Sequence, residues 1–341
     1  GAALRANKTN DFTFSCVLQP RLSKLILNVE STSNSLVFTG LQPSFTSFSG
    51  NVSNSIPNVY ESGTSLVLNQ GVRLDFDTLL PSQFIINAFV FIPSSASGII
   101  PLFKIGQLQL FALNDSIQVD SMSVSFPRNQ WFHVSWIGNG MAMKLVVDGT
   151  SVTDLVARDT VAYFGIGGGG WNGTVLTTGI NVCTSFGSKG IDFLTLLGQD
   201  HQNGCKVSNI YTVFSTGVSS NSLKLFFDCS GTAPLLCASL FSNETHLTFD
   251  DNDPLEICFG RENGIIRLMT TSREANIEAP VSTALLPGDV LIGGQRSFNS
   301  LVRDTFCGMM DDIKLLLGSF NEESLIYVRE TNDNSLRTRS M

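Results

Sequence analysis

Residues 164 to 173, which read FGIGGGGWNG, are the stretch that most resembles a cofactor loop. Gly165, Gly167 and Gly170 have the G-x-G-x-x-G spacing with which a dinucleotide-binding loop brings its backbone close to a pyrophosphate. Such a loop must open a helix, whereas the residues that follow Trp171 are typical of a turn and a strand. We therefore interpret the stretch as a glycine-rich loop between strands and not as a nucleotide site.

The same stretch carries an aromatic side chain, Trp171, next to Gly168 and Gly169. A ring on a glycine loop can stack on a sugar or anchor a protein contact. The alternative that Trp171 folds back into the core stays open, and a glycan on Asn172 would mask the loop. If Trp171 is exposed and Asn172 is unmodified, the sequence predicts a ligand site at Gly168, Gly169 and Trp171.

Acidic residues gather at Asp250, Asp251 and Asp253, where carboxylate oxygens of the kind that bind calcium lie close together. The run lacks the glycine and the distal glutamate of an EF-hand loop, so a solvated acidic turn is the alternative. We expect no cofactor other than calcium at this run.

Known signatures of catalysis are missing from the sequence. It contains no G-x-S-x-G elbow, no H-E-x-x-H motif, no P-loop and no Glu-x-Asp-x-x-Glu strand that would place paired carboxylates across a sugar. The histidines His133, His201 and His246 lie far apart in the chain, and we interpret His133 as a hydrogen-bonded residue of a sheet. The sequence therefore predicts a protein that is not an enzyme.

The clearest local structure lies between Phe126 and Val152, which predict two strands around a tight turn. Gly138, Asn139 and Gly140 supply residues that tolerate a positive φ, and Asp148-Gly149 gives the next turn. Alternation places two sets of apolar side chains on one face, Phe132, Val134 and Trp136 on the first strand and Met141, Met143, Leu145 and Val147 on the second. We expect this face to form core.

Short apolar segments separated by Gly, Pro, Ser and Asn recur along the rest of the chain, as in β-sandwiches and barrels. The first 60 residues hold three strand candidates, and because they are too few for a core of their own we expect them to pair onto later sheets. The sequence thus predicts an all-β fold.

Two segments resemble a known family. Asn129 to Val134 reads NQWFHV and Leu145 to Gly149 reads LVVDG, within a match over 126–152; a second match over 290–325 contains VLIGG, FCGMMDDIKL and NEESL. Both are similar to strands of laminin-G-like domains. The resemblance implies a jelly-roll β-sandwich of the concanavalin-A/laminin-G type, and it implies rim loops that often bind calcium.

An internal repeat suggests two tandem modules. Leu196 to Gln199, Gly204 to Tyr211 and Val218 to Leu223 parallel the segments Leu291 to Gln295, Cys307 to Lys314 and Asn321 to Leu325. We therefore expect N-terminal strands and a linker at 1–60, one module at 61–222, a shorter module at 223–330 and a polar tail at 331–341. One large sandwich with an insertion of roughly 154 to 286 is the alternative.

Composition sets limits on partners and compartment. The 341 residues are 43% hydrophobic and carry a net charge of −8. Because the sequence has no basic run to neutralise phosphates, we expect no direct binding to nucleic acid. No apolar run approaches the ~18 residues of a membrane helix. No signal-like segment follows Gly1, so an exported form would have lost its leader.

The chain has 7 cysteines and five N-glycosylation sequons, at Asn7, Asn51, Asn114, Asn172 and Asn243. If the protein is exported, Cys229 could pair with Cys237, and Cys183 with Cys205. The laminin-G resemblance implies a bridge between Cys258 and Cys307. Spacing alone does not fix any of these pairs.

Three functions remain. The first is an extracellular or cell-surface recognition or adhesion protein that binds protein or glycan through sandwich rim loops. The second is a viral capsid subunit or another self-associating shell protein located in the virion, and the third is a glycan-processing enzyme. Disulfides and N-glycans favour the first, whereas free thiols and bare asparagines favour the second.

Overall fold

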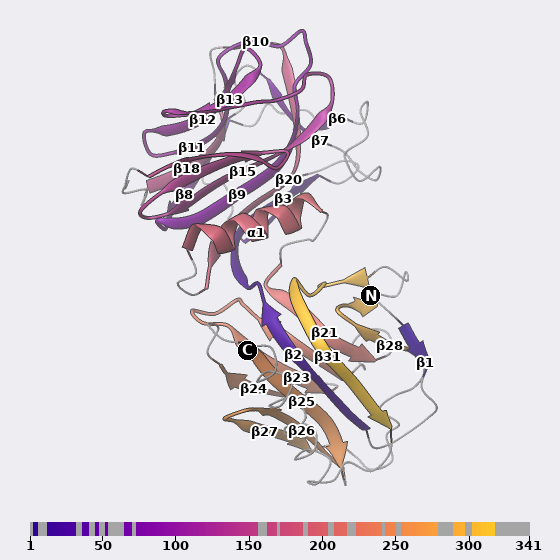
Figure 1. The fold of residues 1–341 in the computed structure, drawn as a ribbon. Helices are drawn as coiled ribbons and strands as arrows, with labels where there is room; N and C mark the ends of the chain where they lie inside the picture. Colours follow the sequence, from indigo (N-terminus) through magenta and orange to yellow (C-terminus); the bar gives the residue numbers. More distant parts are fainter. Residues whose placement is uncertain are drawn as a thin grey trace. The chain divides into compact units, whose positions relative to one another are not determined.

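The chain divides into two compact units, of which one is inserted into the other. Unit 2 is Ser23–Val207, and unit 1 consists of Gly1–Leu22 with Ser208–Met341. The computed structural model describes residues 3–5, 12–31, 36–40, 45–47, 52–53, 65–69, 73–155, 162–168, 171–186, 190–203, 208–216, 223–240, 243–249, 254–262, 264–278, 289–296 and 302–317. Both units are built mainly of β-strands (Figure 1).

Unit 2 is a sandwich of two antiparallel sheets. A nine-stranded sheet follows the order β17 (Thr150–Asp154), β16 (Met143–Val147), β15 (Trp131–Asn139), β9 (Gln83–Phe91), β20 (Thr174–Ser185), β3 (Ser23–Ser31) and β4 (Leu36–Gly40), while β7 (Ser65–Asn69) pairs with β20 and with β6 (Val52–Ser53). A seven-stranded sheet follows the order β14 (Met122–Ser125), β13 (Ser116–Val119), β12 (Leu108–Leu113), β11 (Ile100–Ile105), β18 (Ala162–Gly167), β8 (Arg73–Leu80) and β5 (Phe45–Ser47). The strands β10 (Ser97–Gly98) and β19 (Trp171–Asn172) form a separate two-stranded pair.

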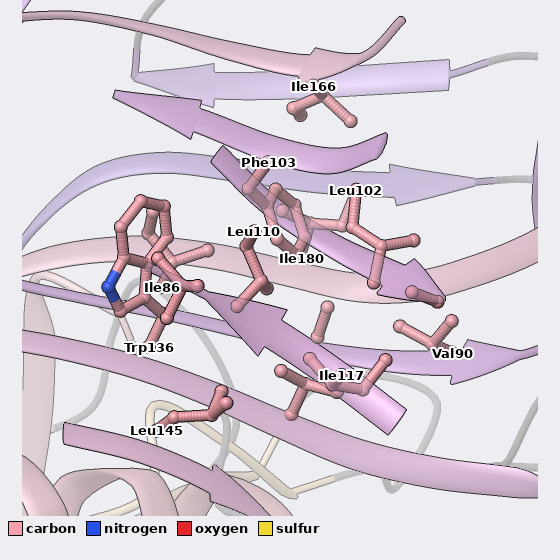
Figure 2. Close-up of a cluster of buried hydrophobic side chains, with 14 of the residues drawn as sticks. Ile86, Val90, Leu102, Phe103, Leu110, Ile117, Trp136, Leu145, Ile166 and Ile180 are labelled. Atoms are coloured by element: carbon pink, nitrogen blue, oxygen red, sulfur yellow. The ribbon is translucent and has the colours of Figure 1, made fainter. Parts of the chain in front are cut away.

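The core of unit 2 lies between these two sheets. Trp136 and Leu145 come from the nine-stranded sheet, and Leu110, Ile117 and Ile166 come from the seven-stranded one; all are fully buried or nearly so (Figure 2). Period-2 alternation produces this core, because every second residue of each strand points to the same face. The predicted class, an all-β jelly-roll sandwich, is confirmed.

The predicted hairpin is present as β15 and β16, with Trp136 opposite Leu145 and Gly138 opposite Met143. Phe132, Val134 and Trp136 are at most 1% exposed, which confirms the predicted core face. The placement of Met141 on that face was wrong, because its side chain is 72% exposed. Met141 lies in the turn, where the side-chain oxygen of Asn139 accepts hydrogen bonds from the backbone N–H groups of Met141 and Ala142.

Unit 2 also contains the helix α1 (Gly190–Gln202), which the sequence interpretation missed. Leu196 to Gln199 was expected to form a strand of the internal repeat, so that element of the repeat is wrong. Leu194, Leu197 and His201 are buried at helical spacing, and Leu194 and Leu197 pack with Ile85 and Ile137 on the outer face of the nine-stranded sheet. Figure 1 shows the helix lying along that sheet.

Unit 1 contains two antiparallel sheets of its own. One follows the order β1 (Ala3–Arg5), β28 (Asp289–Ile292), β21 (Ile210–Thr216), β22 (Leu223–Asp228), β23 (Leu235–Leu240) and β24 (Asn243–Thr248). The other follows the order β27 (Glu274–Glu278), β26 (Ile265–Thr270), β25 (Leu255–Glu262), β2 (Phe12–Pro20) and β31 (Gly308–Leu317), and β29 (Gln295–Arg296) pairs with β30 (Val302–Arg303). The rings of Phe12, Phe14, Phe214 and Phe259 pack against one another in its core.

The unit boundaries differ from the expected modules. The early strands do pair onto later sheets, as expected: β2 lies between β25 and β31, and β3 pairs with β20. However, the chain crosses between units at Leu22/Ser23 and Val207/Ser208, not at 60 and 222. The two segments that resemble laminin-G-like domains therefore fall in different units, and they do not belong to one continuous module.

No disulfide joins the cysteines that the structure describes, and all of them are buried: Cys16, Cys183, Cys229, Cys237, Cys258 and Cys307. The proposed Cys229–Cys237 bridge is absent for a geometric reason. Cys237 is opposite Phe226, whereas Cys229 follows Asp228, so the two cysteines are offset by three positions along the strands. Three positions are roughly 10 Å, beyond the ~7 Å Cα separation that a disulfide tolerates.

The Cys258–Cys307 bridge is absent for a similar reason. Cys258 is opposite Ser15 on β2, whereas the carbonyl of Cys307 accepts a hydrogen bond from the backbone N–H of Arg21. Six positions along β2 separate these sites, which is roughly 20 Å. Cys205, the partner expected for Cys183, lies outside the described residues.

In the part of the chain that the structure describes, no helix has the length and apolar character needed to span a bilayer.

Candidate functional site

The outer face of the seven-stranded sheet of unit 2 carries a distinctive set of side chains, and we name it the open face. On β12, half-buried Gln109 and Phe111 alternate with buried Leu110 and Ala112. On β8, Arg73 and Asp75 point outward while Leu74 is buried. This alternation is typical of a sheet with one face on the core and one toward solvent.

A polar row crosses the open face. The strand registers place Asp75 opposite Gly165, Gly165 opposite Lys104, and Lys104 opposite Gln109. Gly165 contributes no side chain to the row, and an added Cβ there would lie 3.0 Å from Oδ1 of Asp75. The row therefore has polar side chains at both ends, and the Gly165 backbone between them is buried by its neighbours.

The carboxylate of Asp75 is already engaged with a cation of the same strand. Nε of Arg73 lies 2.7 Å from Oδ2 of Asp75, and the two side chains are 54% and 40% exposed. An ion pair this exposed contributes little to stability. It does fix both charged groups at one edge of the row.

Two aromatic side chains lie on opposite sides of the polar row. Tyr163, 59% exposed, is two residues before Gly165 on β18, and Phe111 is two residues after Gln109 on β12. The strands β18 and β12 both pair antiparallel with β11, so they run in the same direction. Two strand spacings across and four residues along separate the rings' Cα atoms by roughly 16 Å.

Beyond Phe111, the open face continues with hydroxyl and amide groups. Gln118 is opposite Phe111, and its Nε2 donates a 2.7 Å hydrogen bond to Oγ of Ser116. The Ser116 hydroxyl in turn donates to the carbonyl of Leu113 at 3.1 Å. These contacts hold the Gln118 amide beside the ring of Phe111.

The rim that leads to Trp171 is organised by Arg128, which sequence reasoning missed. Its guanidinium donates to Oδ1 of Asp115 at 2.6 Å, to the carbonyls of Pro93 and Ala96 at 3.1 and 2.8 Å, and to the carbonyl of Asn114. One arginine thus ties together loops that lie 13 to 35 residues away from it in sequence. Nothing in the local pattern around Arg128 signals these partners.

The glycine stretch is part strand and part rim. Gly165 and Gly167 lie in β18, not in a loop as predicted. Gly168 follows the strand, and a Cβ added there would lie 3.2 Å from the side chain of Pro101. The backbone of Trp171 is opposite Gly98 in the β10–β19 pair. The side chain of Trp171 and the whole of Gly169 lie outside what the structure describes, so the rim prediction stays a prediction.

Some of the remaining predicted sites lie within the described residues and others lie outside them. The sequon residues Asn114, Asn172 and Asn243 are exposed, while Asn7 and Asn51 lie outside the described residues. The acidic run of Asp250, Asp251 and Asp253 also lies outside them. Within the described ranges, no three His, Cys, Asp or Glu side chains are grouped as metal ligands.

His133 is hydrogen-bonded within the sheet region, as predicted, but its partner was not foreseen. Its Nε2 lies 2.8 Å from Nδ1 of His201 on α1, and both rings pack on Phe89. Burial, followed by the neighbouring His201, lowers the pKa of His133 to about 2. Burial lowers the pKa of His201 to about 4, although a hydrogen bond with the Gly179 backbone acts to raise it. This pair belongs to the covered face of the other sheet.

Comparisons with known proteins add little to this geometry. No family model and no curated protein matches the sequence. Solved structures that it resembles include domain 4 of AbnA, an extracellular arabinanase of Geobacillus stearothermophilus in complex with arabinotriose, at 15% identity and a TM-score of 0.36 over 52% of this chain and 99% of that one. Another is the carbohydrate-binding module CBM66 of Bacillus subtilis, at 13% identity and 0.30 over 39% and 91%. A third is the alginate lyase AlgAT5, at 12% and 0.31 over 48% and 95%. At these TM-scores the likenesses support no functional conclusion.

Proposed function

We propose that the protein is a non-enzymatic recognition protein that binds a glycan along the open face of unit 2. The observation that carries this proposal is the placement of Tyr163 and Phe111 on opposite sides of the polar row from Asp75 to Gln109. Aromatic rings offer apolar faces for the C–H groups of a sugar, and the row between them offers donors and acceptors for its hydroxyls.

The charges of the open face favour a neutral ligand. Arg73 and Lys104 are offset by Asp75 and Asp77, and the whole chain carries a net charge of −8. A polyanionic glycan would require a uniformly basic surface. Gly165 and Gly167 project no side chains from β18 but are themselves buried, so an extended, hydroxyl-rich chain lying across β18 would contact the side chains that border them.

The same face lacks the layout of a glycosidase. A retaining or inverting enzyme places two carboxyl groups on either side of the scissile bond. Asp75 and Asp77 come from one strand and would approach a sugar from the same side, and Asp75 is paired with Arg73. We therefore propose binding without catalysis.

The test is glycan-array binding followed by calorimetry with the best ligand. Tyr163→Ala and Phe111→Ala should each weaken binding at least tenfold, while Met141→Ala, which removes another exposed apolar side chain in the hairpin turn, should leave it unchanged. An array on which the wild-type protein binds no glycan contradicts the proposal, as does unchanged affinity in both aromatic variants.

An extracellular or cell-surface setting and a role in adhesion belong to this proposal. Asn114, Asn172 and Asn243 are exposed and hence accessible to a glycosyltransferase. Within this proposal, the laminin-G-like resemblance applies to unit 2 through the β15–β16 hairpin, and calcium at Asp250, Asp251 and Asp253 would be detected by titration calorimetry. Mass spectrometry of protein from secreting cells should find glycans at the three exposed asparagines.

Two observations favour the alternative, a self-associating jelly-roll shell subunit of a virion. No disulfide joins the six cysteines that the structure describes, whereas disulfides would be usual in a secreted protein. Met309, Ile313 and Leu316 are also exposed on β31 of unit 1, as an assembly contact would require. Light scattering distinguishes the two proposals: a shell subunit forms large closed particles, and a recognition protein does not.

A further inference from the structure

The covered face of the nine-stranded sheet contains a buried polar chain that ends in an imidazole N–H. Nδ2 of Asn181 lies 2.7 Å from Nε2 of His201, and it also donates to the carbonyl of Gly179 at 3.0 Å. An amide nitrogen can only donate, so Nε2 of His201 is the acceptor and the proton of His201 is on Nδ1.

The direction of the next hydrogen bond follows from this assignment. Nδ1–H of His201 donates to Nε2 of His133 across 2.8 Å, which leaves the proton of His133 on its own Nδ1. Among the residues that the structure describes, nothing accepts a hydrogen bond from that Nδ1. Both rings are neutral, and each has one nitrogen accepting and one protonated.

An additional proton is poorly accommodated in this arrangement. Protonation of His133 would direct its Nε2–H against the Nδ1–H of His201. Protonation of His201 would direct its Nε2–H toward the amide N–H of Asn181 and toward the carbonyl of Gly179, which already accepts a hydrogen bond from that amide. The rings are 1% and 2% exposed, so water does not solvate the charge either.

Among the described residues that pack on the pair, Phe89 of β9, Ser135 of β15 and Asn181 of β20 are neutral. Asp148, in the turn between β16 and β17, accepts the backbone N–H of His133 through its carboxylate at 2.8 Å. Asp200 precedes His201 on α1, and neither carboxylate is among the groups that set the pKa of either ring.

The pair joins the helix to the sheet at the point where the chain leaves unit 2. His133 is on β15 and His201 is in the last turn of α1, and the chain enters unit 1 at Ser208. The rest of the α1 contact is apolar. Leu194 and Leu197, with the partly buried Ile191 and Phe193, pack against Leu25, Ile85, Ile137, Val146 and Cys183.

We propose that α1 is an acid-released latch: protonation of the His133–His201 pair detaches the helix from the sheet. Release solvates both rings, exposes the apolar patch beneath the helix and frees the α1 segment to lengthen the connection into unit 1. This inference is independent of the glycan proposal, which concerns the opposite face.

The direction of the pH dependence follows from the sign of the pKa shifts. Both pKa values are lower in the docked state than the ordinary value near 6.5, so the released state binds more protons. The docked state is most stable relative to the released state above pH 6.5. This stability decreases as the pH falls from 6.5 toward about 4. With two protons taken up, the released fraction should rise by up to about 100-fold for each unit of pH in that window.

Hydrogen exchange tests the latch in the full-length protein. Protection factors of α1 amides, corrected for intrinsic exchange, should fall between pH 6.5 and 4.5 by up to about 100-fold per unit, while those of β9 fall much less. The double variant His133→Gln/His201→Gln keeps amide donors and acceptors without a titrating ring and should be flat. His246→Gln, at an exposed histidine of unit 1, should behave as the wild-type protein.

Three outcomes overturn the proposal: wild-type protection of α1 that does not change with pH, an equal fall in the double variant, or parallel loss in α1 and β9, which indicates global unfolding. If the double variant does not fold, proton NMR of the wild-type Hε1 resonances decides. The latch predicts no titration in the docked state and slow exchange to a second, protonated set of signals. Fast-exchange titration with a midpoint near the ordinary value of about 6.5 overturns it.

Discussion

The two outer faces of the unit 2 sandwich are made by the same alternation of residues, yet they meet different surroundings. On β15, seven successive residues from Phe132 to Gly138 are buried, because the core covers one side and α1 covers the other. On β12, buried and half-buried residues alternate, because only one side meets the core. A strand's burial pattern therefore reports what lies on both sides of the sheet.

The comparison also shows what polar residues require on each face. Under α1, His133, Ser135 and Asn181 form hydrogen bonds with buried partners, and a mismatch there costs the desolvation of a polar group. On the open face, Lys104 and Gln109 can be hydrated, so they remain available to a ligand. We expect substitutions to change stability on the covered side and binding on the open side.

The largest expected effect on stability is at the centre of the core that lies between the two sheets. Trp136 is fully buried and packs edge-on against Phe84, so Trp136→Ala should lower the free energy of unfolding by about 3–5 kcal/mol. Lys144→Ala, on the neighbouring strand, should cost under about 0.5 kcal/mol. Equal shifts in denaturant titrations would show that the face assignment is wrong.

The second effect concerns the attachment of α1. Leu197 is fully buried against the sheet, whereas Leu196 beside it is 37% exposed. Leu197→Ala should cost about 2–4 kcal/mol of stability and expose the helix to proteolysis. Leu196→Ala is the matched control and should cost under about 1 kcal/mol. If both changes are equally mild, α1 does not form a stable cover.

How far the sequence predicts this molecule can be judged from particular residues. The β15–β16 hairpin was predictable because strict alternation and the Gly138-Asn139-Gly140 turn are local signals, and Gly140 indeed has a φ of 83°. The helix was missed because its apolar spacing is short and is interrupted by Gly198, a poor helix former. The spacing of Leu194, Leu197 and His201 was the available signal.

The side-chain clusters depended on tertiary contacts that no local pattern encodes. His133 and His201 are 68 residues apart in sequence, and Arg128 binds carbonyls up to 35 residues away. The polar row of the open face is likewise assembled from four strands by register. The glycines at 165 and 167 were noticed, but their role in a strand became clear only from its neighbours.

A third, smaller effect separates close packing from helix propensity. At Gly198 an added Cβ would lie 2.8 Å from Oγ of Ser135, whose hydroxyl donates a buried 2.6 Å hydrogen bond to Asn87. Alanine gains about 1 kcal/mol of helix propensity, but overpacking costs typically about 1–3 kcal/mol. Gly198→Ala should thus destabilise the protein by about 1 kcal/mol net, as measured by thermal unfolding. A gain in stability would mean that α1 lies farther from β15.

The smallest effect on stability is expected from the same substitution on the open face. At Gly165 an added Cβ would lie 3.0 Å from Oδ1 of Asp75 and 3.3 Å from the carbonyl of Leu74. The Asp75 side chain is 40% exposed, so its carboxylate can swing away at the expense of a weak surface ion pair. Alanine also removes the entropic cost of a glycine within a strand, about 0.5–1 kcal/mol. Gly165→Ala should therefore change the free energy of unfolding by under about 0.5 kcal/mol while placing a methyl group in the middle of the polar row.

If a glycan lies across that row, its affinity for the Gly165→Ala variant should fall several-fold in calorimetry with no change in the melting temperature of the protein. If Gly165→Ala instead costs as much stability as Gly198→Ala, then the open face is as closely packed as the covered one, and it is not a free ligand surface.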